Sequence, residues 1–356
     1  MEQEVEEMDP LMFLVDLGVL YSVYVILASS LNLEYGELGL PNFAKSAFFA
    51  VGAFSVGALS VRLGTLLLGI TMEGEFKLKS VYYATLVSQA LVNSPQLGVI
   101  LFVVPLMIAV PLAALLGVLA SYPALRLRED YLGMLLIAFS EIIRVVARNY
   151  EPLVGGTYGA GVVDFLAWIP PPLKQVVLLA LSSSIAFAIW LAYYRLSRSP
   201  FGRVLRAIRD NELAASVLGR DVAKMRMTVM ALGSGMAAVA GVLYAFYVGS
   251  VNPDDFTISK TFLVALMVII GGRGNPYGAL VGPATYIAVD RSIQFVKQYL
   301  ALPFDPNYAS YVILGVALIL IVMKKPEGIA PEKPAITLPS ALRRALSPRH
   351  TVPKPD

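Results

Sequence analysis

Residues 195–226, RLSRSPFGRVLRAIRDNELAASVLGRDVAKMR, form a basic loop in a chain that is otherwise mostly apolar. The loop holds eight lysines and arginines against three acids, and apolar stretches long enough to cross a bilayer flank it on both sides. Because Lys and Arg beside helix ends resist translocation, we expect the loop to be cytoplasmic. Its segment RAIRDNELAASVLG (206–219) predicts a short helix with small residues on one face, which suggests a docking surface for a soluble partner.

The composition indicates an all-α membrane protein that crosses the bilayer several times. The 356 residues are 57% hydrophobic and only 15% charged, and the mean hydropathy is +0.69. Soluble domains are nearer half apolar and a quarter charged. With no cysteine and one histidine, His350, the chain is not expected to form disulfides or a metal site. The net charge of +3 is small, so we expect no nucleic-acid binding.

Nine apolar segments are expected to form a helical bundle, and a count of eight fits the sequence nearly as well. The segments are 11–33, 42–68, 98–121, 130–148, 174–194, 227–250, 259–271, 276–297 and 307–323. The segment 259–271 is too short to span alone and is followed by GGRGN, which predicts a broken or re-entrant helix.

The distribution of Lys and Arg predicts the orientation and three regions of the chain. The basic, Pro-rich tail 324–356 is expected to be cytoplasmic and disordered, and the turn RLRED at 126–130 is also expected inside. The acidic segment 1–10 then lies outside, ahead of one transmembrane domain over 11–323. The segments 69–97 and 149–173 also fall outside.

Two turns share the pattern Gly-x-x-Gly-x-Pro: GELGLP at 36–41 and GGRGNP at 271–276. Transporters often carry diverged repeats whose broken helices meet at the substrate site. Gly and Pro are also common in membrane helices, so duplication and chance both remain open. The candidate hinge residues are Gly36, Gly39, Pro41, Gly271, Gly272, Gly274 and Pro276.

Charged residues inside apolar segments are candidates for a polar pathway or for structural ion pairs. An unpaired charge at mid-bilayer costs about 2.5–3.5 kcal/mol on insertion scales. Glu141 and Arg144 are spaced to pair on one helix face. Lys45 has no acid closer in sequence than Glu37. The others are Asp16, Arg62, Asp290 and Arg291.

Two stretches rich in small residues, GSGMAAVAG (233–241) and VGAFSVGALS (51–60), predict close contact between helices. Small side chains let helix backbones approach one another in a membrane, where there is no hydrophobic drive between helices. We therefore expect these stretches to serve packing rather than chemistry.

Six stretches, taken together and in order, resemble the permease subunits of branched-chain amino acid ABC importers, in particular the LivM-like branch. The resemblance covers about residues 20–330. The stretches are SSLNLEYGELGLPNFAKSAFFAVGAF, PALRLREDYLGMLLIAFSEIIRVV, GGTYGAG, SPFGRVLRAIRDNELAASVLG, IIGGRGNPYGALVGPA and KKPEGI.

The resemblance implies a multi-pass cell-membrane subunit that imports branched-chain or similar aliphatic amino acids and is not itself an enzyme. The chain has no P-loop, so ATP and Mg are expected on two cytoplasmic ATPase subunits. A second homologous permease and an extracytoplasmic solute-binding protein complete the implied set of partners. The residues implied to couple to the ATPases are Arg206, Arg209, Glu212, Ala214, Ala215 and Gly219.

Two departures from the family pattern leave alternatives open. Leu213 precedes the Ala pair where the family has Glu, and Lys45 stands where the family commonly has His. A fixed positive charge at Lys45 either binds a carboxylate or anchors the helix. Within the family, a permease for urea or another small amide or carboxylate is the alternative. From another class, the alternative is an ion-coupled secondary transporter that uses Lys45, Glu141 and Arg144.

Overall fold

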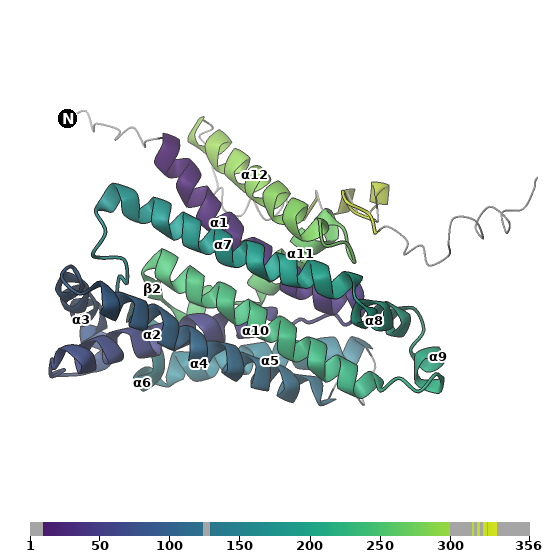
Figure 1. Ribbon diagram of the computed structural model, residues 1–356, viewed down its shortest axis with the longest axis horizontal. Coiled ribbons are helices and arrows are strands. Elements are labelled where there is room, and N and C mark those ends of the chain that lie inside the picture. Colours follow the sequence, from purple (N-terminus) through teal and green to yellow (C-terminus); the bar gives the residue numbers. More distant parts are fainter. Residues whose placement is uncertain are drawn as a thin grey trace, which may run out of the picture.

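The computed structural model describes residues 10–123 and 129–299 and short pieces between 315 and 332, and these are helical apart from turns and one pair of two-residue strands (Figure 1). The longer helices are α1 (Pro10–Leu31), α2 (Lys45–Leu68), α3 (Phe76–Leu91), α4 (Pro95–Ser121), α5 (Glu129–Asn149), α7 (Pro171–Arg198), α8 (Pro200–Asp210), α10 (Val222–Val248), α11 (Ile258–Gly271) and α12 (Gly278–Tyr299). The short elements are η1 (Asn32–Glu37), α6 (Glu151–Val154), η3 (Gly156–Tyr158), β1 (Ala160–Gly161), α9 (Glu212–Val217), β2 (Ser250–Val251) and η4 (Pro253–Asp255).

The prediction of a polytopic helical bundle is confirmed. Each of the first eight expected segments coincides with a helix of the described chain. Within the part of the chain that the structure describes, five helices are long and apolar enough to cross a membrane; these are Leu11–Glu37, Lys45–Leu68, Pro95–Ser121, Leu173–Arg198 and Val222–Val248. Most of the ninth segment, residues 126–128 of the basic turn, residues 1–9 of the acidic segment and most of the tail lie outside the described residues, so the number of spans remains a prediction.

Helices α2 and α10 pack closely, as the small-residue stretches predict. A Cβ added to Gly52 of α2 would lie 2.1 Å from the Ala238 carbonyl oxygen, and one added to Gly241 of α10 would lie 2.0 Å from the Phe49 oxygen. Only glycine leaves room for backbones this close. These contacts place α2 and α10 at the centre of the bundle.

Helix α1 runs parallel to α7 along most of its length. Gly18 contacts Leu179, and the Ser22 and Ser183 hydroxyls are hydrogen-bonded at 3.1 Å. Further along, the Ser197 hydroxyl donates to Glu37. Ser22 contacts the residue 161 positions later in the chain, and Glu37 contacts the residue 160 positions later. The two helices therefore keep nearly the same register along this contact.

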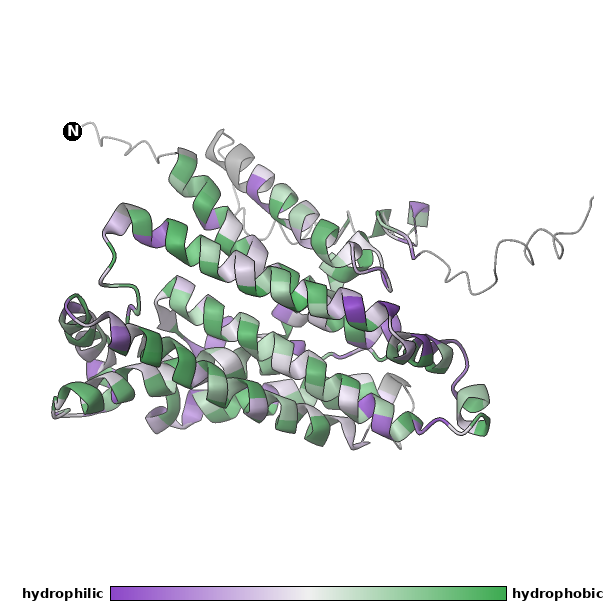
Figure 2. Ribbon diagram, in the orientation of Figure 1, coloured by the Kyte–Doolittle hydropathy of each residue, from purple (hydrophilic) through white to green (hydrophobic). Residues whose placement is uncertain are grey.

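The two ends of the bundle differ. Helices α8 and α9 lie at one end, here named the basic-loop end, and α3, α6 and the β1–β2 pair lie at the other, the far end (Figure 1). Green, apolar colouring dominates the helices in Figure 2, and a purple cluster marks the junction of α7 and α8.

Helix α3 falls within the expected outer segment 69–97, where the sequence analysis predicted no helix. Its Val87 fits against Gly64 of α2.

Helices α11 and α12 form a tight hairpin around the second glycine turn. A Cβ on Gly271 would lie 2.0 Å from the Gly278 oxygen, and one on Gly282 would lie 2.0 Å from the Met267 oxygen. With 14 residues, α11 is about 21 Å long at 1.5 Å per residue, too short to cross a bilayer alone. The predicted break at GGRGN is therefore present.

Candidate functional site

The basic loop consists of two helices rather than the single helix expected over 206–219. Ser199 accepts a hydrogen bond from the Gly202 N–H and begins α8. Asn211 has extended backbone angles that end α8, and its side chain accepts from the Ala214 N–H to begin α9. Gly219, with φ of 78°, ends the loop's helical part, as the sequence analysis expected.

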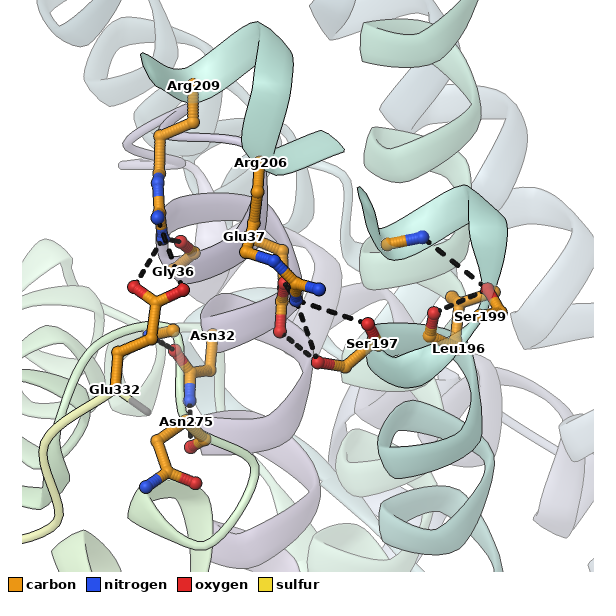
Figure 3. Close-up of polar contacts among 12 residues, drawn as sticks. Asn32, Gly36, Glu37, Leu196, Ser197, Ser199, Arg206, Arg209, Asn275 and Glu332 are labelled. Atoms are coloured by element: carbon orange, nitrogen blue, oxygen red, sulfur yellow. Dashed lines mark hydrogen bonds and ion pairs between the residues drawn. The ribbon is translucent and has the colours of Figure 1, made fainter. Parts of the chain in front are cut away.

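Arg206 of α8 reaches back into the bundle and binds Glu37, the last residue of η1, the π-helical turn that continues the end of α1. Its Nη1 lies 2.6 Å from Oε2 of Glu37, whose side chain is fully buried. The same nitrogen donates to the Ser197 carbonyl oxygen at 3.1 Å, and the Ser197 hydroxyl donates to the other Glu37 oxygen (Figure 3). Arg206 therefore joins the loop to the ends of α1 and α7.

Arg209 makes the second link between α8 and α1. It donates to the Gly36 carbonyl oxygen at 2.6 Å and pairs with Glu332 at 3.0 Å (Figure 3). Partial burial lowers the pKa of the Arg209 guanidinium, but the carboxylates of Glu332 and Asp210 outweigh it, so the pKa lies above its usual value. Arg209 is therefore a permanent cation at this junction.

The two glycine turns predicted as hinges lie against one another beside Arg209. Asn32 bridges them: its Nδ2 donates to the Asn275 carbonyl oxygen at 2.9 Å, and its Oδ1 accepts from the Gly274 N–H at 2.9 Å (Figure 3). A Cβ on Gly36 would lie 2.5 Å from the Gly274 nitrogen. We name this contact, formed by Asn32, Gly36, Gly274 and Asn275, the turn junction.

The other hinge candidates lie around the turn junction. Gly39, with φ of 79°, packs against the Arg209 side chain. Pro41 lines a small cavity with Arg209. The Pro276 carbonyl oxygen accepts a 2.8 Å hydrogen bond from the Trp190 indole of α7.

The chain after the last predicted span returns to the same place. The Ile329 N–H donates to Ile270 at 2.8 Å and the Ala330 N–H donates to Gly271 at 2.9 Å. Asn275 donates to the Pro331 oxygen at 2.9 Å. The last residue of the KKPEGI motif (324–329) thus begins a strap that holds the second glycine turn.

Helix α9 presents an apolar tip at the basic-loop end. Leu213, Val217 and Leu218 are 78%, 86% and 80% exposed, whereas Ala215 is buried. We name these three residues the apolar tip. Of the expected coupling residues, Ala214 and Glu212 are exposed, Glu212 pairs with Arg226 at 2.8 Å, and nothing lies within 4 Å of a Cβ built at Gly219.

The buried partner of Lys45 is Glu34, which the sequence analysis did not single out. Lys45 Nζ lies 2.6 Å from Glu34 Oε2, and the two side chains are 1% and 0% exposed. Asn42 donates to the same oxygen at 3.0 Å, and Glu34 contacts Gly233 near the middle of α10. The available signal was an acid, Glu34, at the end of an apolar segment.

A hydroxyl cluster adjoins this ion pair. The Ser46 N–H donates to the Thr261 hydroxyl at 2.9 Å, and the Ser46 and Ser140 hydroxyls lie 2.8 Å apart. The cluster joins α2, α5 and α11 inside the bundle.

Glu141 and Arg144 form the pair that their spacing predicts. Arg144 Nη1 also lies 2.5 Å from Asp254 in η4. The contact ties α5 to the far-end loops, and Glu141 remains about half exposed at 47%. Among the residues that the structure describes, no group of three metal-ligating side chains is placed to hold a metal ion.

A multi-span helical bundle with a broken-helix hairpin and an exposed helical loop is typical of the membrane subunits of transporters. The sequence profile described as "Branched-chain amino acid transport system / permease component" matches residues 13–322. The chain therefore belongs to the family of branched-chain amino acid ABC transport permeases.

Individual relatives agree with this assignment. The chain is 36% identical over 324 residues to the probable branched-chain amino acid transport permease protein LivM of Methanocaldococcus jannaschii, covering 90% of this chain and 93% of the relative. It is 27% identical over 341 residues to the high-affinity permease LivM of Escherichia coli K12, covering 89% and 70%. It is 29% identical to the probable LivH permease of M. jannaschii, covering 88% and 89%. No solved structure matches the chain significantly.

Proposed function

We propose that this chain carries branched-chain or similar aliphatic amino acids inward as one of two unlike permease subunits of an ABC importer. Two ATPase subunits dock on the α8–α9 loop, and an extracytoplasmic binding protein delivers the substrate at the far end. ATP and Mg bind to the ATPases. The basic-loop end, with the tail, is cytoplasmic, and the N-terminus lies outside.

The observation that carries the proposal is the apolar tip. Three large apolar side chains that are each more than three-quarters exposed are costly in water and typical of a binding surface. A groove of about 600 Å³ adjoins the tip between α8, α9 and α10, and Phe201, Ala215 and Leu218 line it. The tip offers exposed apolar side chains that a partner can cover, and the groove offers room for a side chain of the partner.

Contacts behind the tip support a mechanical role for the loop. Arg206 and Arg209 connect α8 to Glu37 and Gly36 at the end of α1, and Gly36 lies on the turn junction with α11 and α12. When ATP draws the ATPases together, a pull on α9 moves α8. This displacement passes as a rigid-body movement to the ends of α1 and of the α11–α12 hairpin.

Co-purification tests the proposal. The tagged chain, expressed with its neighbouring genes, is expected to elute with two ATPase subunits and a second permease. Gly219→Arg, which places a long charged side chain beside the apolar tip, is expected to stay in the membrane and lose the ATPases. Arg195→Gln, an exposed change on α7 outside the groove, is the control. Normal ATPase association and uptake with Gly219→Arg would contradict the docking proposal.

A further inference from the structure

A cavity of about 620 Å³ lies at the far end, between α1, α3, α7 and α10. Small-molecule sites usually have about 300–1,000 Å³ and mostly apolar walls with a few placed polar groups. The apolar wall here comes from several elements and includes Val15, Val19, Val162, Leu178 and Phe246. This end is opposite the basic loop. In the proposed orientation, a substrate arriving from outside meets the far end first.

Three charged side chains line the cavity: Asp16, Lys174 and Asp164. Asp16 of α1 accepts a 2.6 Å hydrogen bond from the Tyr247 hydroxyl of α10. Lys174 of α7 forms an ion pair with Asp164. An ionisable residue within a membrane span is costly and commonly marks a substrate path, and Asp16 lies in the span Leu11–Glu37.

The register of α1 and α7 sets the spacing of these charges. The offset of 161 residues at Ser22 and Ser183 places Asp16 beside position 177 of α7. Lys174 is three residues nearer the far end, which corresponds to about 4.5 Å along the helix axis at 1.5 Å per residue. Because both residues line the same cavity, one small molecule that carries a cation and an anion can contact both charges.

Lys174 is held in place by Asp164, and its ammonium group keeps donors for a further acceptor. Asp164 is itself fixed, because its Oδ1 accepts from the Leu166 N–H at 3.1 Å, and its backbone N–H donates to Ser88 at 2.9 Å. An ammonium has three donors, so the pair with Asp164 leaves Lys174 able to bind a second carboxylate.

We propose that this cavity is an entry site for a zwitterionic aliphatic amino acid. Asp16, supported by Tyr247, binds the α-ammonium group; Lys174 binds the α-carboxylate; and the aliphatic side chain packs against the valines, Leu178 and Phe246. The choice of an amino acid as the ligand rests on the proposed function.

Binding of charge-deleted analogues tests the site with the full chain in lipid nanodiscs. The probes are L-leucine, isoamylamine (leucine without its carboxylate) and isocaproate (leucine without its ammonium), measured by saturation-transfer NMR. Asp16→Asn is expected to weaken leucine and isoamylamine on the order of tenfold, the effect of one lost charged hydrogen bond, and to spare isocaproate. Lys174→Gln is expected to weaken leucine and isocaproate and to spare isoamylamine.

The matched controls are Glu151→Gln and Lys77→Gln, which remove an acid and a lysine that pair at 3.0 Å outside the cavity. Both are expected to bind all three probes normally. Absence of leucine binding to the wild-type chain, unchanged binding in both cavity variants, or equal weakening of both analogues in one variant would overturn the site.

Leucine uptake by the assembled transporter separates this inference from the proposed function. Failure of the wild-type transporter to import leucine contradicts the proposed function. Normal import by Asp16→Asn and Lys174→Gln transporters contradicts the entry site alone.

Discussion

Arg206 of α8 and Glu37 at the end of α1 are joined by an ion pair with 2.6 Å between Nη1 and Oε2. Glu37 is fully buried, so a loop residue supplies the charge that balances an acid inside the bundle. Arg209 holds the adjacent Gly36 carbonyl oxygen. Helix α8 is therefore attached to two successive residues of η1, and α8 cannot move without displacing η1, which continues α1, or breaking both contacts.

Replacement of Arg206 by Gln is expected to destabilise the protein and impair transport. The Glu37 carboxylate would remain buried without its cation, which costs about 3–5 kcal/mol. We expect a lower melting temperature in detergent and a loss of leucine uptake that exceeds any loss of bound ATPase. The double variant Glu37→Gln/Arg206→Gln should recover most of the stability but not the uptake. A single variant as stable as Arg195→Gln would contradict a structural ion pair.

Replacement of Lys45 by Met is expected to destabilise the protein strongly, because Glu34 would be left buried and charged. Removal of one partner of a buried pair costs about 3–5 kcal/mol, whereas neutralising both partners is often far less harmful. Glu34→Gln/Lys45→Met should therefore melt well above Lys45→Met. Uptake by the stable double variant then decides the role of Lys45: normal kinetics assign it to anchoring, and a defect assigns it to the pathway.

Two glycines of α10 provide a matched test of the contact with Glu34. A Cβ on Gly233 would lie 2.1 Å from Glu34 Oε1 and 2.5 Å from its Cδ, whereas one on Gly235 has its nearest atom at an ordinary 3.5 Å. Overpacking of a tight interior costs about 1–3 kcal/mol. Thermal unfolding should show Gly233→Ala to be destabilised by about that amount and Gly235→Ala to resemble the wild type. Equal melting temperatures would contradict this packing.

Asn32→Asp is expected to open the turn junction with almost no change in side-chain shape. The variant keeps an acceptor for the Gly274 N–H but loses the donor to the Asn275 carbonyl oxygen. A buried acceptor left without a donor costs about 1–3 kcal/mol, and more when it is a carboxylate. Reduced stability and faster hydrogen exchange around 271–276 would support the role of Asn32. Unchanged exchange there would show that the two turns hold together without it.

The apolar segments and the glycine patterns predicted much of this fold. Eight expected segments coincide with helices because a membrane span must be long and apolar, and that property is local in sequence. The echo between GELGLP and GGRGNP left duplication and chance both open, and in the structure Gly36 lies against Gly274. Small residues at 233–241 likewise predicted the contact of α10 with α2.

Pairings between distant residues were not predictable in the same way. Lys45 pairs with Glu34 rather than with the nearer Glu37, because the π-helical turn η1 and the loop after it bring residue 34 back beside the start of α2. Similarly, the small-residue pattern of the loop does not reveal that Ala215 faces inward while Leu213 and Leu218 face out. Helix α3 was missed because its segment is too polar to be recognised as a span.

The most direct test of the account is the accessibility of position 218 in the assembled complex. Since the chain has no cysteine, Leu218→Cys introduces a single thiol at the apolar tip, and Tyr158→Cys, 68% exposed at the far end, is the control. Maleimide should label both positions rapidly in the chain alone. In the complex with the ATPases, Cys introduced at 218 should become protected while the control at 158 stays reactive. Equal labelling of position 218 with and without the ATPases would contradict docking on this loop.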